Sequence, residues 1–418
     1  MKFRIAAVIL SFLCQGSHQV DGFQASIGAC KAPSTVSSTA LFNVVAQVGD
    51  GQDRRFMYMT EEQDRTLKEK GDYEASLMKK PRPLKPNKVR GGAGGFGGAA
   101  KKKNSKNSKS KSPEDNLAAI QSHAKALQTD GIVRIDNVLS PNIADALRDY
   151  LIDLRARSTA AIESGEITDS QQRFADVLLN QNRCDLKIPL GPEPVNNALR
   201  DLLASETAIV RQVMEYVFES YGGVGRDAEL WELNCFMSNS GARRQLVHAD
   251  NVCLEPVIGL KNEMEPIVLT CFVALQDIDE TMGPTVWMPG THTLEAHNRF
   301  FETGVDEAST PTDTFSPKDT ILQSSKAVLG TIPKGACVIF DPRVLHCAGA
   351  NTCPDPDKTR ALFYVSFKNP KIDNPGCPST SGYGVATAEI TMEALTEDLK
   401  AEVTGQPARK MNIVSCFP

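Results

Sequence analysis

The sequence predicts a mainly β fold, a sandwich or jelly roll, with α-helices around it. From residue 229 onward the chain contains short runs with β-type patterning, and turn pairs such as Gly283-Pro284 and Pro289-Gly290 separate them. Several short strands with such punctuation are typical of two-sheet β folds. The expected strands are Glu229–Met237, Gln245–Cys253, Ile267–Leu275, Thr285–Met288, Ala336–Asp341 and Arg360–Phe367.

Helical patterns precede these strands. At residues 130–135 an Asp-Gly turn leads into a short strand, and Ser140-Pro141 then supplies an N-cap followed by proline at the first helical position. Apolar residues recur after it at helical spacing, and a second helix is predicted from about Asn196 to Ser220. The strand at 267–275 is apolar at nearly every position, so we expect both of its faces to be covered.

The N-terminus has the pattern of a targeting segment. Residues 1–22 read as a signal peptide, with basic residues before an apolar run that is too short to span a bilayer. Residues 23–49 begin with Phe23, contain no acidic residue and are rich in Ser and Thr. Together they resemble the bipartite presequence of algae with secondary plastids, which predicts localisation to the plastid through the secretory pathway. A plain secretory signal, leading to the endoplasmic reticulum or to secretion, is the alternative.

Residues 50–112 are predicted to be a polar, largely disordered linker, with ordered structure beginning near Pro113. Within it, residues 53–78 could form a helix but lack a continuous apolar stripe. Of the 46 Lys and Arg residues, twelve lie at 79–112, so 34 remain against 51 Asp and Glu, a net charge of −17. A chain this acidic outside 79–112, which includes the predicted domain at 113–418, argues against nucleic-acid binding. No run after the presequence is long and apolar enough to predict membrane insertion. The cysteines show neither CxxC nor zinc-finger spacing, and we expect most to be buried.

Three residues suggest a metal centre. His248 and Asp250 lie two apart in a β-type run, so their side chains can point to the same side of the strand. His346 follows Asp250 by 96 residues and ends another β-type run, a separation that a jelly roll closes by pairing an early strand with a late one. Two His and one carboxylate form the facial arrangement that leaves coordination positions open on iron(II). An isolated HxD is a weak signal, and the second histidine strengthens it.

Arg360 opens the apolar strand that follows His346. A dehydrated guanidinium requires an anionic partner, which it pairs through two parallel hydrogen bonds. The distal carboxylate of 2-oxoglutarate meets that need, and an acidic neighbour is the structural alternative. Arg343 is the next candidate for such an anchor.

These motifs together resemble the phytanoyl-CoA dioxygenase family of Fe(II)/2-oxoglutarate-dependent oxygenases. The resemblance rests on the HAD string at 248–250, GPTVWMPGTH at 283–292, and KGACVIFD at 334–341 leading to His346 and Arg360. It implies a double-stranded β-helix (cupin-like jelly roll). It also implies iron(II) bound by His248, Asp250 and His346 as the catalytic metal, 2-oxoglutarate anchored by Arg360 as the cosubstrate, and dioxygen as the oxidant. His292 and His297 are excluded as a metal pair, because residues five apart share neither a strand face nor a helix face.

The function implied is hydroxylation of a small-molecule or acyl substrate with release of succinate and carbon dioxide. Members of the family act on acyl thioesters, amino acids, alkaloids and other small molecules, so the resemblance implies no particular substrate. Two alternatives stay open. One is a jelly-roll metalloenzyme that does not use 2-oxoglutarate, and the other is a jelly-roll binding module without catalytic activity.

Overall fold

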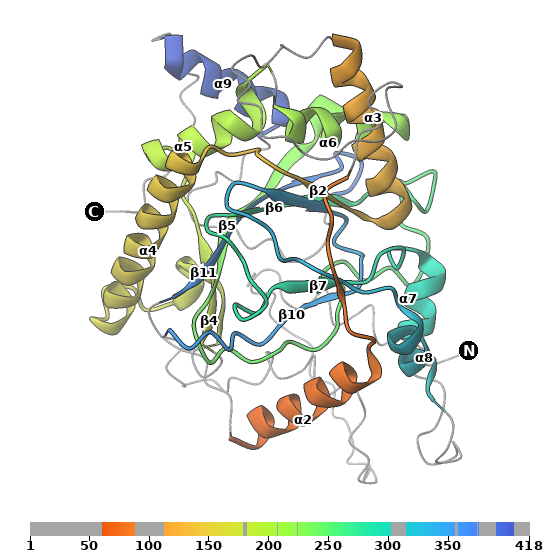
Figure 1. The fold of residues 1–418 in the computed structure, drawn as a ribbon. Coiled ribbons are helices and arrows are strands. Elements are labelled where there is room, and N and C mark those ends of the chain that lie inside the picture. Colours follow the sequence, from red (N-terminus) through yellow and green to blue (C-terminus); the bar gives the residue numbers. More distant parts are fainter. Residues whose placement is uncertain are drawn as a thin grey trace, which may run out of the picture. The chain divides into compact units, whose positions relative to one another are not determined.

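Two β-sheets form the centre of the molecule in this computed structural model (Figure 1). The larger sheet has the strand order β2-β9-β6-β11-β5-β4-β3, and the smaller has the order β1-β8-β7-β10. The strands of the larger sheet are β2 (Ile132–Ile135), β3 (Phe174–Leu178), β4 (Arg183–Lys187), β5 (Glu229–Ser238), β6 (Val268–Ala274), β9 (Cys337–Phe340) and β11 (Arg360–Lys368). Those of the smaller sheet are β1 (Arg82–Pro83), β7 (Thr285–Trp287), β8 (Val328–Leu329) and β10 (His346–Ala348). The mainly β fold with flanking helices is therefore confirmed.

The structure describes residues 61–87, 113–178, 182–206, 208–223, 225–301, 315–355, 358–373, 375 and 390–404. The predicted signal and transit segments at 1–49 and the Gly/Lys-rich part of the linker at 88–112 lie outside these ranges. Within them, no helix combines the length and apolar character needed to cross a membrane.

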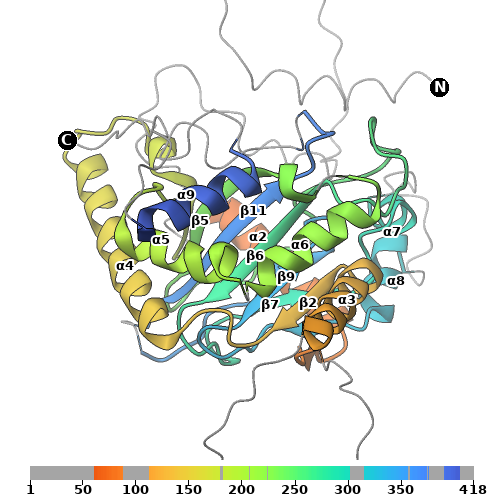
Figure 2. The same ribbon diagram turned by 90° about the horizontal axis from the view of Figure 1, so that it is seen from above.

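Helices cover the outer face of the larger sheet (Figure 2). They are α3 (Pro113–Asp130), α4 (Pro141–Glu163), α5 (Glu193–Leu199), α6 (Ile209–Ser220) and α9 (Met392–Thr404). Leu147 and Val213 of these helices belong to one buried apolar cluster with Leu233, Cys271 and Val365 of the strands. This packing leaves the opposite face of the sheet free to line a pocket.

Local sequence signals explain several of these elements. Ser140 caps α4 by accepting a hydrogen bond from the Ile143 amide, and Pro141 occupies the first turn, as predicted. Gly131 has φ 72°, and a Cβ there would lie 2.4 Å from Val344, so the turn before β2 requires glycine. β6 lies between β9 and β11 and is almost entirely buried, which confirms the prediction from its apolar run.

The single helix predicted at 196–220 is wrong. The chain instead forms α5, a π-helical turn η4 (Arg200–Ala204) and then α6, with extended backbone at Ser205. Side chains of α6 satisfy carbonyl groups at the break: Arg211 donates to the Leu203 carbonyl and Gln212 to that of Glu206. The spacing of apolar residues in the sequence does not show that side-chain donors replace backbone donors at this point.

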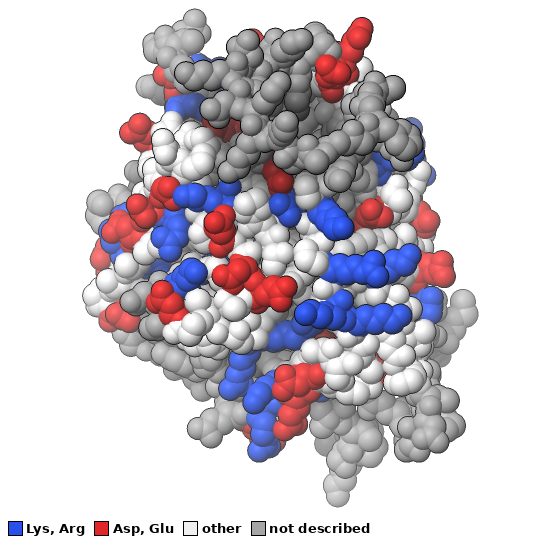
Figure 3. All heavy atoms as spheres, viewed as in Figure 1, with Lys and Arg blue, Asp and Glu red and all other residues white. Residues whose placement is uncertain are grey.

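The predicted start of ordered structure near Pro113 is also wrong. Residues 61–87, here called the N-terminal strap, form α2 (Glu61–Leu77) and β1, and β1 pairs in parallel with β8. Leu84 is buried in the cluster that contains Trp287 and Phe340. Lys79, Lys80, Arg82 and Lys85 are exposed. Basic side chains gather near the segment that follows α2 and contains β1, at the centre right of Figure 3, while acidic and basic side chains are mixed over the left half.

Two short helices, α7 (Leu294–Phe300) and α8 (Pro317–Ser324), pack beside the smaller sheet. Six of the seven cysteines in the described ranges are buried, as the sequence predicted for most.

Candidate active site

Two backbone segments place the predicted histidines side by side. His346 is the first residue of β10, and His248 pairs with it through an isolated antiparallel bridge with N–H···O distances of 2.9 and 2.8 Å. The ring centroids are 4.5 Å apart. The strand predicted at 245–253 is otherwise not formed, because the Asp250 amide turns away to donate to the Pro342 carbonyl at 2.9 Å.

Each imidazole is oriented by a backbone carbonyl two residues before it. Nδ1 of His248 lies 2.8 Å from the Leu246 oxygen, and Nδ1 of His346 lies 2.8 Å from the Val344 oxygen. A carbonyl can only accept, so each Nδ1 carries the proton and each Nε2 presents a lone pair. Metal-binding histidines are held in this way in many proteins.

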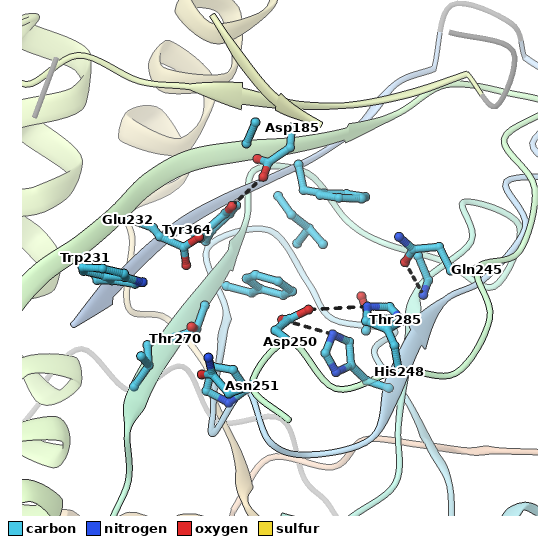
Figure 4. A pocket seen from close by; sticks show the side chains of 18 of the residues that line it. Asp185, Trp231, Glu232, Gln245, His248, Asp250, Asn251, Thr270, Thr285 and Tyr364 are labelled. Carbon is cyan, nitrogen blue, oxygen red and sulfur yellow. Dashed lines mark hydrogen bonds and ion pairs between the residues drawn. The ribbon is translucent and has the colours of Figure 1, made fainter. Parts of the chain in front are cut away.

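Asp250 faces both lone pairs (Figure 4). Its two oxygens lie 3.5 Å from Nε2 of His248 and 3.5 Å from Nε2 of His346. These separations exceed ordinary hydrogen-bond lengths and suit three ligand atoms around one ion. Within the described ranges, this is the one group of three such side chains whose ligand atoms lie within 4.8 Å of one another. The structure thus brings the three predicted residues together.

The protonation states of Asp250 and His346 agree with metal binding, whereas a metal ion must compete with a proton at His248. Burial alone would lower the pKa of His248, but the hydrogen bond and charge of Asp250 raise it overall. Burial lowers the pKa of His346 below its ordinary value, although Asp250 opposes the shift. Burial alone would raise the pKa of Asp250, but His346 and His248 lower it overall. At neutral pH the site therefore holds a carboxylate and, at His346, a neutral imidazole, which are the forms that bind metals.

The three residues border a cavity of about 330 Å³ between the two sheets. One wall comes from β5, β6 and β11 of the larger sheet, and the other contains Thr285 of β7 and Ala348 of β10. Alternation along β11 aims Arg360, Leu362 and Tyr364 at the cavity, while the residues between them pack under the helices. A volume of this size suits a small molecule.

Arg360 is fully buried at the start of β11 and lines the same cavity. Its Nη1 donates to the Gly283 carbonyl, whereas Nε and Nη2 are buried without a hydrogen-bond partner. Burial, with a smaller contribution from Arg183, lowers its pKa to about 9. The guanidinium is still charged at neutral pH, and its two unsatisfied donors fit a carboxylate that binds in the cavity.

Arg343, the other candidate anchor, is already satisfied. It forms a buried bidentate pair with Asp341, with an Nη2–Oδ2 distance of 2.6 Å, and donates to the Glu263 carbonyl. His297 accepts the Cys253 amide at 2.9 Å through Nδ1, and its Nε2 lies 2.6 Å from the Arg343 carbonyl oxygen. Arg343 and His297 thus have structural roles, and the group of three clustered side chains does not include His297 or His292.

Sequence reasoning missed most of the cavity wall. The side chain of Gln245 accepts a hydrogen bond from the Ala348 amide of β10 at 2.9 Å. Tyr364 lines the cavity four residues after Arg360 on β11. The two-residue alternation along β11 could have identified Tyr364. Asp185 lies on β4, a short charged strand with no apolar pattern to reveal it.

The family profile described as phytanoyl-CoA dioxygenase matches residues 127–359. Solved structures with similarity include SnoK, a non-haem α-ketoglutarate-dependent carbocyclase from nogalamycin biosynthesis, at 17% identity over 60% of this chain and 83% of that one, with a TM-score of 0.38. The epimerase SnoN from nogalamycin biosynthesis is 18% identical over 60% of this chain and 84% of its own, with a TM-score of 0.37. AviO1 from Streptomyces viridochromogenes Tue57 is 16% identical over 60% of this chain and 95% of its own, with a TM-score of 0.37. These structural likenesses are too distant to bear on activity.

No curated protein sequence matches the chain. The family match, in contrast, spans more than half of its 418 residues, and it contains the three clustered side chains. The chain therefore belongs to the phytanoyl-CoA dioxygenase family and is an iron- and 2-oxoglutarate-dependent dioxygenase.

Proposed function

We propose that this protein hydroxylates a small molecule, with His248, Asp250 and His346 holding iron(II) and Arg360 holding the distal carboxylate of 2-oxoglutarate. The reaction consumes one C–H bond, dioxygen and 2-oxoglutarate, and it forms a C–OH bond, succinate and carbon dioxide. The bound iron and cosubstrate supply the oxidising chemistry, and the protein supplies ligands, orientation and a shielded cavity.

The observation that carries the proposal is the pair of unsatisfied donors on Arg360 in the same cavity as the three clustered ligands. A jelly-roll metalloenzyme without 2-oxoglutarate has no need of a buried cation there. A binding module has no need of two imidazoles whose Nδ1 atoms are committed to carbonyls and whose Nε2 atoms converge on a carboxylate.

The chain's own residues explain how the cavity favours this chemistry. The Leu246 and Val344 carbonyls keep the two imidazoles in the metal-binding tautomer. Arg360 is rigid because Gly283 accepts one of its N–H groups, so the remaining donors are aimed before any ligand arrives. Such preorganisation lowers the ordering cost of binding.

The experiment compares His346→Ala with a matched histidine variant, His292→Ala. Purified proteins are loaded with iron(II) without oxygen, and retained iron is measured before succinate formation across a metabolite panel. His346→Ala is expected to lose iron and succinate formation together, whereas folded His292→Ala retains iron, since His292 bonds instead to the Gln128 carbonyl. Normal iron retention and turnover in His346→Ala contradict the assignment.

A further inference from the structure

Gln245 binds Ala348 of β10 through both its backbone and its side chain. Its backbone amide donates to the Ala348 carbonyl at 2.9 Å, and its side-chain oxygen, Oε1, accepts the Ala348 amide at 2.9 Å. Because a backbone N–H can only donate, the second bond determines which end of the carboxamide is the oxygen. The orientation of the side-chain nitrogen, Nε2, is therefore fixed as well.

The two N–H groups on Nε2 of Gln245 have no acceptor among the residues that the structure describes. Gln276 provides the contrast, because its oxygen accepts the Ala361 amide at 3.2 Å and its nitrogen donates to the Ala361 carbonyl at 3.1 Å. Gln245 lines the cavity (Figure 4), and Gln276 does not. A molecule in the cavity can therefore receive hydrogen bonds from Gln245.

The contact with Gln245 lies toward the end of β10 at which Arg360 is held. His346 and Ala348 are two residues apart on β10, so both side chains face the cavity. In the antiparallel pairing of β10 with β7, Ala348 lies opposite the first residue of β7. The Gly283 carbonyl that accepts from Arg360 comes two residues before that strand. Gln245 thus contacts β10 between a proposed metal ligand and the proposed anchor.

The donors at this end of the cavity suit a carboxylate. A carboxylate has about four lone-pair sites that accept hydrogen bonds. Arg360 offers N–H groups on two nitrogens, Nε and Nη2, which are buried without a partner. Gln245 can add a further donor that carries no charge, so the anion remains matched by the guanidinium alone.

We propose that Gln245 binds the distal carboxylate of 2-oxoglutarate together with Arg360, with Nε2 as the donor. This inference rests on the proposed function, because it takes Arg360 as the anchor of 2-oxoglutarate. The same side chain holds Ala348, two residues after His346, so the contact with the cosubstrate is supported by the strand that carries a proposed metal ligand.

The test is anaerobic titration of the iron(II)-loaded protein with 2-oxoglutarate, with the iron dissociation constant measured separately by competition with a chelator. Gln245→Met removes the donor without adding charge, and the backbone bond to Ala348 remains. Because a hydrogen bond to a charged group is lost, 2-oxoglutarate is expected to bind roughly 10- to 150-fold more weakly, while iron affinity stays at the parent value. Unchanged affinity for 2-oxoglutarate overturns the inference.

A purely structural role of Gln245 gives a different result. A side chain that only holds β10 also affects His346, so Gln245→Met then lowers the affinities for iron and 2-oxoglutarate together, which contradicts the proposal. Gln245→Glu keeps an acceptor for the Ala348 amide. A structural role therefore predicts parent 2-oxoglutarate affinity in Gln245→Glu, whereas the proposal predicts a loss at least as large as in Gln245→Met, because a carboxylate replaces the donor.

Gln212→Glu is the matched control for the added charge. Gln212 lies on α6, where its side chain bonds to Asn116 and to the Glu206 carbonyl, and it does not line the cavity. Gln212→Glu is expected to keep the parent affinity for 2-oxoglutarate. A loss in Gln212→Glu equal to that in Gln245→Glu attributes the effect to net charge and overturns the inference.

A double-mutant cycle tests whether Gln245 and Arg360 bind the same carboxylate. The effects of Gln245→Met and Arg360→Lys on 2-oxoglutarate affinity are expected to depart from additivity by at least about 2-fold, because both side chains contact one group. Additive losses place the contact of Gln245 at another part of the ligand and contradict the proposal.

The parent protein separates the two hypotheses. A parent protein that fails to bind 2-oxoglutarate refutes the proposed function itself. A parent that binds 2-oxoglutarate, combined with unchanged affinity in Gln245→Met and Gln245→Glu, refutes only the role of Gln245.

Discussion

Glu74 of the N-terminal strap supports the segment that presents His248. Its carboxylate is 4% exposed and accepts the Val247 amide at 2.7 Å, immediately before the proposed ligand. The other carboxylate oxygen lies 2.7 Å from the Lys318 ammonium of α8. Because the 245–251 segment bonds to β10 only through Gln245 and the bridge at His248, this contact from α2 replaces part of a missing strand ladder. We therefore expect Glu74→Ala to loosen the metal site.

The magnitude follows from what each substitution leaves behind. Glu74→Ala leaves the buried Val247 amide without an acceptor, which costs about 1–3 kcal/mol. Lys318 is 38% exposed and can be solvated, so its loss of a partner adds at most about 1 kcal/mol. Iron affinity is expected to fall about 10-fold, the lower end for groups that orient metal ligands through one intermediate. Glu74→Gln keeps an acceptor for Val247 and has a smaller effect on both quantities.

Lys318→Met is the matched control. It leaves the bond from Val247 to Glu74 intact but deprives a buried carboxylate of its cation, so it lowers stability with little change in iron affinity. Denaturant unfolding of the metal-free proteins gives the stabilities, and competition with a chelator gives the iron dissociation constants. Parent iron affinity in Glu74→Ala, or an equal loss of affinity in Lys318→Met, refutes the proposed support of the metal site.

Three further predictions concern the anchor, the core and the presequence. Arg360→Ala leaves the bound carboxylate of 2-oxoglutarate unpaired, at a cost of about 2–5 kcal/mol, and is expected to weaken 2-oxoglutarate binding by roughly 30-fold to several thousand-fold. Arg360→Lys recovers only part of that affinity. Unchanged binding of Arg360→Ala in anaerobic titration places the anchor elsewhere. Asp341→Asn leaves Arg343 buried without its anion and costs about 3–5 kcal/mol. Burial alone would raise the pKa of Asp341, but Arg343 lowers it overall. The pair therefore contributes its full stabilisation above the pKa of Asp in the unfolded chain, about 3.9, and this stabilisation is lost as the pH falls through the lower pKa of the folded state. The free energies of unfolding of parent and variant should converge in acid, and a difference that stays constant with pH contradicts this linkage. We propose that residues 1–49 direct a fused fluorescent protein to the plastid and that Phe23→Ala retains it in the secretory system; secretion of the unaltered fusion rules out plastid import.

The sequence predicted the strands whose patterns are local and strong. The run at 267–275 is apolar on both faces because β6 is central, and the start of β11 follows directly from the apolar run after Arg360. The sequence allowed a helix at 53–78, but it did not predict that the N-terminal strap packs on the domain through β1. Leu84 is the buried anchor of a segment otherwise dominated by exposed Lys and Pro, and the partner that β1 pairs with, β8, lies some 245 residues later in the chain. Composition does not reveal a pairing of that range.

The candidate site also has one part that the sequence predicts and another part that it does not. His248, Asp250 and His346 could be predicted because their residue types are restricted and their spacing matches strand geometry. The part of the cavity wall that contains Asp185 could not be predicted, because its position depends on the register of several strands. Asp185 reaches the cavity only because β4 pairs with β5 so that Asp185 opposes Phe236. Neither β4 nor its register is encoded in a local apolar pattern.

The two sides of the cavity belong to different sheets, so their relative position requires a direct link. Arg360 begins β11 of the larger sheet and donates to the carbonyl of Gly283, two residues before β7 of the smaller sheet. Gly283 has φ 64°, and a Cβ at that position would lie 2.6 Å from the Gly349 carbonyl oxygen, so no larger residue presents its carbonyl there without displacing the chain just after β10. Because β10 begins with His346, the glycine ties the proposed anchor to the strand that carries a proposed ligand. The carbonyl of Gly283 is thus one of the links between the metal and cosubstrate sides, and the guanidinium that bonds to it keeps two donors for the ligand.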